Sequence, residues 1–169
     1  MNQKSQKAAP NGQTHEAQLQ LVSFTVGHEQ FAVDILHVQE INRMMELTKV
    51  PQSPVGVEGI INLRGRIIPV MSLRKRFGLE KTEHNDQTRI VVVEIGGNTI
   101  GFIVDAVQEV LRINASIVEK TPPLSSGIDA AYVSGVARLE HSLLILLDLD
   151  NLLPSEVVNA VSRMSNLAA

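Results

Sequence analysis

The tetrapeptide Val38-Gln39-Glu40-Ile41 occurs a second time, almost unchanged, as Val107-Gln108-Glu109-Val110, which lies 69 residues later. The same offset relates the segment from Gly27 to Val33 to the segment from Gly96 to Phe102. Because a solenoid needs about three or more repeats, two copies indicate two similar small subdomains that pack side by side. A groove between such subdomains is a natural place to bind a ligand or a partner.

A second block of sequence also repeats. Residues 59–73 return as residues 135–149, with an offset of 76. Each repeat spans roughly 65 residues, a size at which a chain buries only about 60% of its unfolded surface. We therefore expect the two halves to share an interface.

Alternation of apolar and polar residues predicts short strands joined by tight turns. Gly96-Gly97 is a strong hairpin signal, and Ser72 and Asp148 are suited to cap short helices that close the two halves. The predicted hairpins are 22–26 with 31–35, 59–63 with 66–71, 90–95 with 99–104, and 133–139 with 143–147, with third strands at 39–44 and 108–113.

About five short strands in each half indicate a mainly β protein made of two small five-stranded barrels, since closure removes exposed sheet edges. The expected organisation begins with a disordered N-terminal tail (1–18) and a first barrel (19–80). A link (81–88) leads to a second barrel (89–154) and a helical C-terminal tail (155–169), and each barrel ends in a short helix.

Composition restricts the class of function. The 169-residue chain has no cysteine, no tryptophan, one tyrosine and four phenylalanines, and its net charge is −3. Binding of single-stranded nucleic acid usually needs aromatic stacking platforms, so this composition disfavours a nucleic-acid partner. There is no apolar run of roughly 20 residues that could span a bilayer, and the polar N-terminus lacks the apolar core of a signal peptide. We therefore expect a cytoplasmic protein that does not insert into the membrane.

Candidate catalytic groups are sparse. The five histidines are scattered, without the spacing that metal ligands need, and no phosphate-binding loop is present. Asp148 and Asp150 lie two residues apart, as paired carboxylates sometimes do, but Asp148 is more simply explained as a helix cap. The sequence therefore predicts no catalytic residue, no metal, no cofactor and no enzymatic activity.

The segment Asn62-Leu63-Arg64-Gly65-Arg66 admits two interpretations. In the first, it is an ordinary hairpin tip, with Gly65 at positive φ and both arginines in solvent. In the second, a carboxylate holds Arg64, and Glu40 is the best candidate. Exposed ion pairs contribute little to stability, so the residues alone favour the first interpretation.

Three segments nevertheless strongly resemble the CheW family of chemotaxis adaptors. They are the block from Gly59 to Val70, which contains Asn62-Leu63-Arg64-Gly65 followed by Ile68-Pro69-Val70, the segment from Asp34 to Ile41, and the segment from Phe102 to Val107. The resemblance runs from about Leu19 to Leu153. It implies two five-stranded barrels of the SH3-like type, which agrees with the repeat.

The resemblance also implies partners. A CheW-like protein is a non-enzymatic scaffold that binds the cytoplasmic tip of a chemoreceptor and the regulatory domain of the histidine kinase CheA. Together they form rings in membrane-associated receptor arrays, to which the protein would be recruited, and further copies of CheW are also possible ring members. An adaptor for another chemosensory pathway, such as surface motility or second-messenger control, is the alternative.

Site residues are carried over by position. In the family the receptor tip lies in an apolar groove between the barrels, and kinase contact is expected at barrel ends, here around Asn62 to Arg66 and Val133 to Leu147. The Arg64–Glu40 pair would position these contact loops. Without the resemblance, the five groove residues would be assigned to the core. The implied receptor groove is Val22, Ile35, Val38, Ile41 and Val107, and the implied kinase-contact and positioning residues are Glu40, Asn62, Leu63, Arg64 and Gly65.

Overall fold

A computed structural model describes residues 17–52, 56–120, 129–152, 159 and 163. The first half contains β1 (Gln18–Val26), β2 (Glu29–Asp34), the 3-10 helix η1 (Ile35–His37), β3 (Val38–Arg43), β4 (Val57–Leu63), β5 (Arg66–Ser72) and α2 (Leu73–Arg76). The second half contains β6 (Arg89–Ile95), β7 (Asn98–Val104), β8 (Ala106–Asn114), η2 (Ala115–Ile117), β9 (Val118–Glu119), η3 (Ala130–Tyr132), β10 (Val133–Arg138), β11 (Leu143–Leu147) and α3 (Leu149–Leu152).

The predicted strands are confirmed, with β1 beginning at Gln18, inside the segment expected to be a disordered tail. The rest of that tail and the expected C-terminal helix lie outside the continuously described residues. Both predicted caps are present, since the Ser72 hydroxyl accepts a hydrogen bond from the Lys75 N–H at the start of α2. The Asp148 carboxylate likewise accepts hydrogen bonds from the Asp150 and Asn151 N–H groups at the start of α3.

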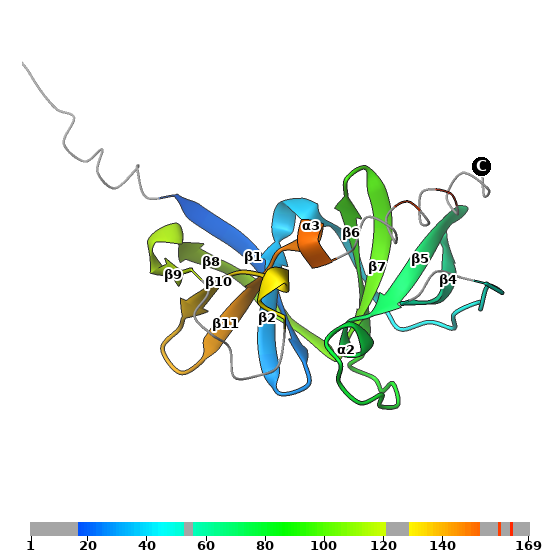
Figure 1. Cartoon of the computed structure of the whole chain (residues 1–169), viewed down its shortest axis with the longest axis horizontal. Helices are drawn as coiled ribbons and strands as arrows, with labels where there is room; N and C mark the ends of the chain where they lie inside the picture. The colour runs from blue at the N-terminus through cyan, green and yellow to red at the C-terminus, as the bar shows by residue number, and fades with distance from the viewer. Residues whose placement is uncertain (1–16, 53–55, 121–128, 153–158, 160–162, 164–169) are drawn as a thin grey trace, which may run out of the picture.

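The strands form two sheets that lie side by side in Figure 1. One has six strands in the order β8-β1-β2-β11-β10-β9, and the other has five in the order β3-β6-β7-β5-β4. Only β2 with β11 and β5 with β7 pair in parallel among the described strands. The fold is therefore mainly β with two subdomains, as expected, although the two-residue β9 gives one sheet a sixth strand.

The expected division of the strands at residues 81–88 is wrong. The hairpin β1–β2 joins β8, β10 and β11 of the second half, whereas β6–β7 joins β3, β4 and β5 of the first. Each half of the sequence thus contributes its first hairpin to one sheet and its later strands to the other. The two copies have the same strand pattern, so the pattern alone does not decide which copy's strands each hairpin joins.

The exchange makes the two sheets equivalent under the repeat. The order β8-β1-β2-β11-β10 corresponds strand by strand to β3-β6-β7-β5-β4. In Figure 1 the β1–β2 and β6–β7 hairpins point in opposite directions, as do β10–β11 and β4–β5, which a near-two-fold rotation requires.

The segment that follows β3 connects the two edge strands of the five-stranded sheet, β3 and β4. After β3, Thr48 exchanges two backbone hydrogen bonds of 2.9 and 2.8 Å with Ile60 in the opposite edge strand β4. Gly59 permits this approach, because a Cβ atom there would lie 2.8 Å from the Thr48 carbonyl oxygen. In the other sheet β9 takes the equivalent place, and Gly135 is its glycine, with a Cβ position only 2.5 Å from a Val118 methyl group.

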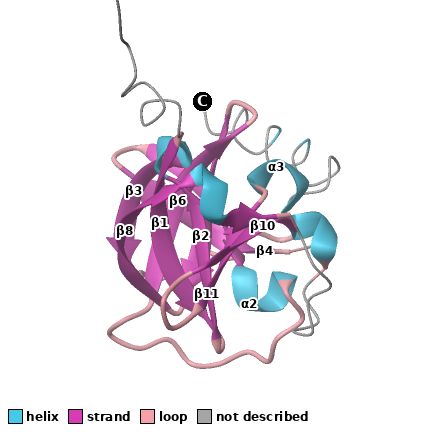
Figure 2. Cartoon of the chain, turned by 90° about the vertical axis from the view of Figure 1, so that its left-hand side faces the viewer, coloured by secondary structure: helices cyan, strands magenta, loops and turns pink. Residues whose placement is uncertain are grey.

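One hydrophobic core joins the two sheets. Phe31, which is fully buried, stacks on Phe77 with ring centroids 4.9 Å apart, and on Phe24 at 6.1 Å. Side chains from both sheets and from α2 and α3 complete this shared core. Figure 2 shows α2 and α3 on one side of the molecule and the edge strands β3 and β8 on the other. The shared core confirms the expectation that the two halves share an interface.

Candidate functional site

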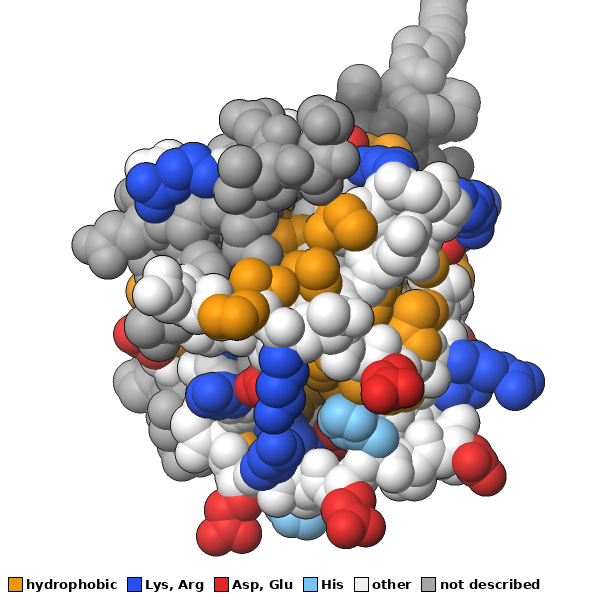
Figure 3. All heavy atoms as spheres, turned by 90° about the vertical axis from the view of Figure 1, so that its right-hand side faces the viewer, with side chains coloured by type: hydrophobic (Ala, Val, Ile, Leu, Met, Phe, Trp, Pro, Cys, Tyr) orange, Lys and Arg blue, Asp and Glu red, His pale blue; other side chains and the backbone are white. Residues whose placement is uncertain are grey.

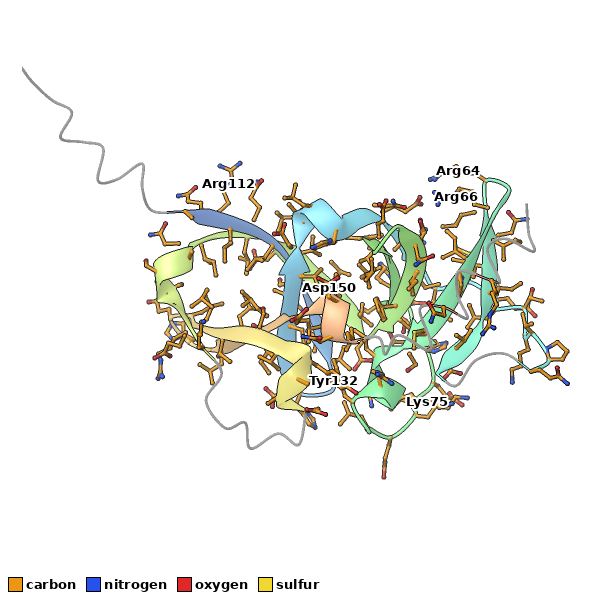
Figure 4. All side chains as sticks on the ribbon, turned by 45° about the horizontal axis from the view of Figure 1, so that its top comes forward. Arg64, Arg66, Lys75, Arg112, Tyr132 and Asp150 are labelled. Carbon is orange, nitrogen blue, oxygen red and sulfur yellow. The ribbon has the colours of Figure 1, made fainter. Side chains whose placement is uncertain are left out.

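The tip of the β4–β5 hairpin holds Arg64 at a fixed place. Arg64 and Gly65 both have positive φ, 53° and 85°, as the central residues of a type I′ hairpin turn do. The Asn62 side-chain oxygen accepts a hydrogen bond of 2.9 Å from the Gly65 N–H, which braces the turn. Figure 4 shows Arg64 and Arg66 together at this tip.

Arg64 forms a two-pronged ion pair with Glu40. Its Nη1 and Nη2 atoms donate hydrogen bonds of 2.7 and 3.0 Å to the two oxygens of Glu40 in β3. The pKa of Glu40 is lowered, mainly by the hydrogen bonds that it accepts from Arg64. The same contact raises the pKa of Arg64. The sequence left two interpretations open, and this geometry is that of the second. The Arg64 side chain remains 76% exposed, so most of it is free to meet a partner.

Val38 and Ile41 point to one face of β3, although they are three residues apart. A regular strand would place them on opposite faces, but the register shifts between Val38 and Glu40. Val38 pairs with Val93 and Ile41 with Val91, and directly opposed residues share a face. Both partners belong to the shared core. Val38 packs against that core, and Ile41 is 39% exposed beside it.

Val107 and Val110 form the equivalent pair in β8. The register shifts there too, so that Val107 pairs with Phe24 and Val110 with Val22 on the core side of β1. Val107 packs against the shared core, and Val110 is 55% exposed. Sequence reasoning named Val107 but missed Val110, although the repeat of the tetrapeptide contained the signal. We call Val38 with Ile41 the β3 wall, and Val107 with Val110 the β8 wall.

The glutamines at the two register shifts, Gln39 and Gln108, also form matching hydrogen bonds. Gln39 donates a hydrogen bond of 2.8 Å to Glu94, and Gln108 donates one of 2.8 Å to Thr25. Thr25 and Glu94 are themselves 69 residues apart, so the two bulges are held in the same way.

The remaining predicted groove residues differ in exposure. Val22 is only 2% exposed and lies inside the shared core, where a partner at the surface would not reach it. Ile35 is partly buried in η1, at the crossing from β2 to β3. Its neighbour Leu36, which sequence reasoning did not name, is 87% exposed.

The second hairpin tip differs from the first in charge. Glu140 and His141 occupy the place of Arg64 and Gly65, so the equivalent of the ion pair would bring together Glu140 and Glu109, two carboxylates. In the range expected for kinase contact, Leu143 follows this tip and is 50% exposed.

Asp105 ties the two subdomains together where β7 leads into β8. Arg74 of α2 donates to both of its carboxylate oxygens, with bonds of 2.9 Å from Nε and from Nη2. The Gly27 N–H, in the β1–β2 turn, donates a third hydrogen bond of 2.8 Å to the same carboxylate. The side chains of Arg74 and Asp105 are 22% and 30% exposed. This partly buried contact therefore links elements of both sheets, and it raises the pKa of Arg74.

A cavity of about 860 Å³ opens beside the five-stranded sheet. Met45, Leu47 and Ile103 contribute apolar surface, while Lys49, Glu58, Lys81 and Glu83 are among its charged lining residues. Figure 3 views this side of the molecule, where apolar side chains surface among positive, negative and histidine side chains. In the part of the chain that the structure describes, no three histidine, aspartate or glutamate side chains are placed to share a metal ion.

The sequence profile of the CheW-like domain matches residues 20–157. The chain belongs to the CheW-like family. It is 34% identical over 154 residues to the chemotaxis protein CheW of Treponema pallidum, covering 89% of this chain and 91% of that protein. It is 32% identical over 142 residues to CheW of Klebsiella aerogenes, covering 84% and 86%.

A solved structure supports the same assignment. The scaffolding protein CheW of Thermoanaerobacter tengcongensis superimposes with a TM-score of 0.74 at 41% sequence identity, covering 80% of this chain and 92% of that one. CheW-like proteins are non-enzymatic adaptors or scaffolds of chemotaxis, so family membership supports the expectation that this chain is not an enzyme. No helix among the described residues is long and apolar enough to cross a bilayer.

Proposed function

We propose that this chemotaxis adaptor couples chemoreceptors to the histidine kinase CheA. The observation that carries the proposal is the partly exposed apolar β3 wall next to the Arg64–Glu40 ion pair. An amphipathic helix binds by laying apolar side chains against such a surface. Val38 and Ile41 offer these contacts, with Ile35 beside them at the edge of the shared core.

Kinase contact is proposed at the two hairpin ends. The β4–β5 tip presents Asn62, Leu63 and Arg64 in a fixed conformation, because the Gly65 N–H and the Glu40 carboxylate both hold it. The β10–β11 end presents a different surface, with Leu143 exposed. Two unequal ends suit head-to-tail assembly, because a heterologous interface joins two different surfaces. Through these contacts the protein would be recruited from the cytoplasm to membrane-associated arrays, where further copies of it could join the rings.

The test is co-elution of the full chain with a chemoreceptor signalling-tip fragment and, separately, with a CheA regulatory domain from the same organism. Binding to both partners is the expected result. Binding to neither, with all three proteins folded, would mean that the family assignment holds but the coupling role does not.

A further inference from the structure

The short helix α2 carries two arginines that both reach the other subdomain. Arg74 donates hydrogen bonds of 2.9 Å from Nε and from Nη2 to the carboxylate of Asp105, at the point where the chain enters β8. Arg76 donates one of 2.9 Å from Nε to the Leu152 carbonyl oxygen in α3, and its guanidinium carbon lies 5.2 Å from the centre of the Tyr132 ring in η3. The helix α2 continues β5 of the five-stranded sheet, whereas η3 and α3 flank β10 and β11 of the six-stranded sheet.

Both partners of the Arg74 contact are also fixed to their own subdomain. On the five-stranded side, Arg74 Nη1 donates a hydrogen bond of 2.8 Å to the Glu80 carbonyl oxygen. On the six-stranded side, the Asp105 N–H donates one of 2.9 Å to the Thr25 carbonyl oxygen, and the Gly27 N–H donates one of 2.8 Å to the Asp105 carboxylate. A two-pronged contact between arginine and a carboxylate has a defined geometry, because the guanidinium donors lie in one plane. The contact therefore fixes a direction between the subdomains as well as a distance.

The second copy of the repeat has no equivalent of these arginines. Asp150 and Leu152 of α3 occupy the positions of Arg74 and Arg76, 76 residues later in the chain. The Asp150 side chain forms no hydrogen bond or ion pair with any described residue. The apolar contacts of the shared core hold the subdomains together, but such contacts are non-directional. The directional side-chain contacts that start from the paired helices thus come from α2 alone, on the side of the molecule where both helices lie (Figure 2).

We propose that Arg74 and Arg76 are positioning residues that set the angle between the two subdomains, and that this angle decides whether the protein assembles into closed rings. The role rests on the kinase contacts proposed above, which lie at hairpin ends of different subdomains. In a head-to-tail assembly each subunit adds one rotation, and the assembly closes only if that rotation fits a ring. Loss of the two arginines should therefore leave each single contact intact and impair the closed assembly.

The first experiment measures the angle without any partner. The chain has no cysteine, so Arg43→Cys in β3 and Leu143→Cys in β11, both at exposed positions, place one spin label on each sheet. Double electron–electron resonance should give one narrow distance distribution for the labelled protein. The added substitutions Arg74→Gln and Arg76→Gln should broaden it. Lys75→Gln is the matched control, because Lys75 lies between the two arginines in α2 but is 67% exposed and has only a 3.7 Å contact with Glu58.

The spin-label result decides the structural part of the inference. An unchanged distribution in the folded double-glutamine variant would overturn it, as would equal broadening in the Lys75→Gln control. If the double variant does not fold, Arg76→Gln alone is measured by the same criterion, because it leaves the Arg74–Asp105 contact in place.

The second experiment tests assembly with the full chain without labels. The variant Arg74→Gln, Arg76→Gln is expected to bind a CheA regulatory domain and a receptor signalling-tip fragment, each alone, with the affinity of the unaltered protein. Co-sedimentation of the variant with full-length CheA and receptor fragments together should fall by about threefold or more, because subunits with a variable angle do not close a ring. Lys75→Gln should co-sediment as the unaltered protein does.

The outcomes separate this inference from the proposed function. If the distance distribution broadens but co-sedimentation is unchanged, the angle does not control assembly and the positioning role is overturned, while the coupling function stands. If the unaltered protein binds neither partner, the proposed function fails and the positioning role fails with it, whereas the spin-label result still shows whether α2 sets the angle.

Discussion

Arg64, at the tip of the β4–β5 hairpin, holds both carboxylate oxygens of Glu40 in β3, at 2.7 and 3.0 Å. Glu40 lies in β3, one edge strand of the five-stranded sheet, and Arg64 lies in the turn that follows β4, the opposite edge strand. The ion pair therefore fixes the kinase-contact candidate, which is the tip, relative to the receptor-contact candidate, which is the β3 wall.

Reversal of this pair should disturb assembly. Arg64→Glu places two carboxylates together, so we expect the hairpin tip to leave its position and co-elution with receptor and kinase fragments to weaken. The exchange Glu40→Arg with Arg64→Glu restores opposite charges and should recover part of the loss, which a double-mutant cycle measures. If the exchanged pair recovers nothing, a simple ion pair is not the explanation.

The Glu40 contact should make stability depend on pH. Arg64 lowers the pKa of Glu40 in the folded protein, so in the acidic range the unfolded chain binds the proton more readily and stability rises with pH. The contribution is present above the ordinary glutamate pKa and is lost as the pH falls through the lowered one. Thermal melts of the unaltered protein and of Arg64→Gln should therefore differ at neutral pH and converge in acid. A difference that persists unchanged below the lowered pKa would contradict this account.

A charge in the β3 wall should weaken receptor binding. Val38→Glu puts a carboxylate against the shared core, where it has no partner, so the affinity for a receptor signalling-tip fragment should fall by about tenfold or more. Circular dichroism and retained binding of the CheA regulatory domain would show that the variant is folded. Unchanged receptor affinity in that folded variant would remove Val38 from the site.

Loss of the Asp105 carboxylate should destabilise the protein. Asp105→Ala leaves Arg74 and the Gly27 N–H without their partner in a partly buried place, which should cost about 1–3 kcal/mol in the free energy of unfolding. Lys75→Ala is the control, because its contact with Glu58 is 3.7 Å long and its side chain is 67% exposed. Urea titration measures both variants, and equal stabilities would show that Asp105 does not fasten the two subdomains.

Damage to the shared core should affect both sheets equally. Phe31→Ala removes a fully buried ring that stacks on Phe24 and Phe77, a change that typically costs about 3–5 kcal/mol. Because one core serves both sheets, methyl NMR signals of Ile145 and of Val91 should disappear in the same transition. Separate transitions for the two sheets would mean that the subdomains unfold independently.

The sequence alone predicted the local elements because their signals are local. Glycine turns, alternating residues and the caps Ser72 and Asp148 identified the strands and both short helices. The repeat identified two similar subdomains, and the Asn62 to Val70 segment led to the family. Val110 could also have been found, since it occupies the position of Ile41 in the second copy of the tetrapeptide.

The tertiary structure decided which strands pair, which side chains share a face, and which of them reach the surface. Both copies carry the same pattern, so the pattern cannot say whether β1–β2 pairs with its own half or with the other. The register shifts that bring Ile41 beside Val38 depend on the neighbouring strands β6 and β1, not on the tetrapeptide itself. Burial likewise depends on what packs nearby, which is why Val22 lies inside the core while Val110 is exposed. Sequence determines what each segment can form, whereas long-range pairing chooses among partners that look alike locally.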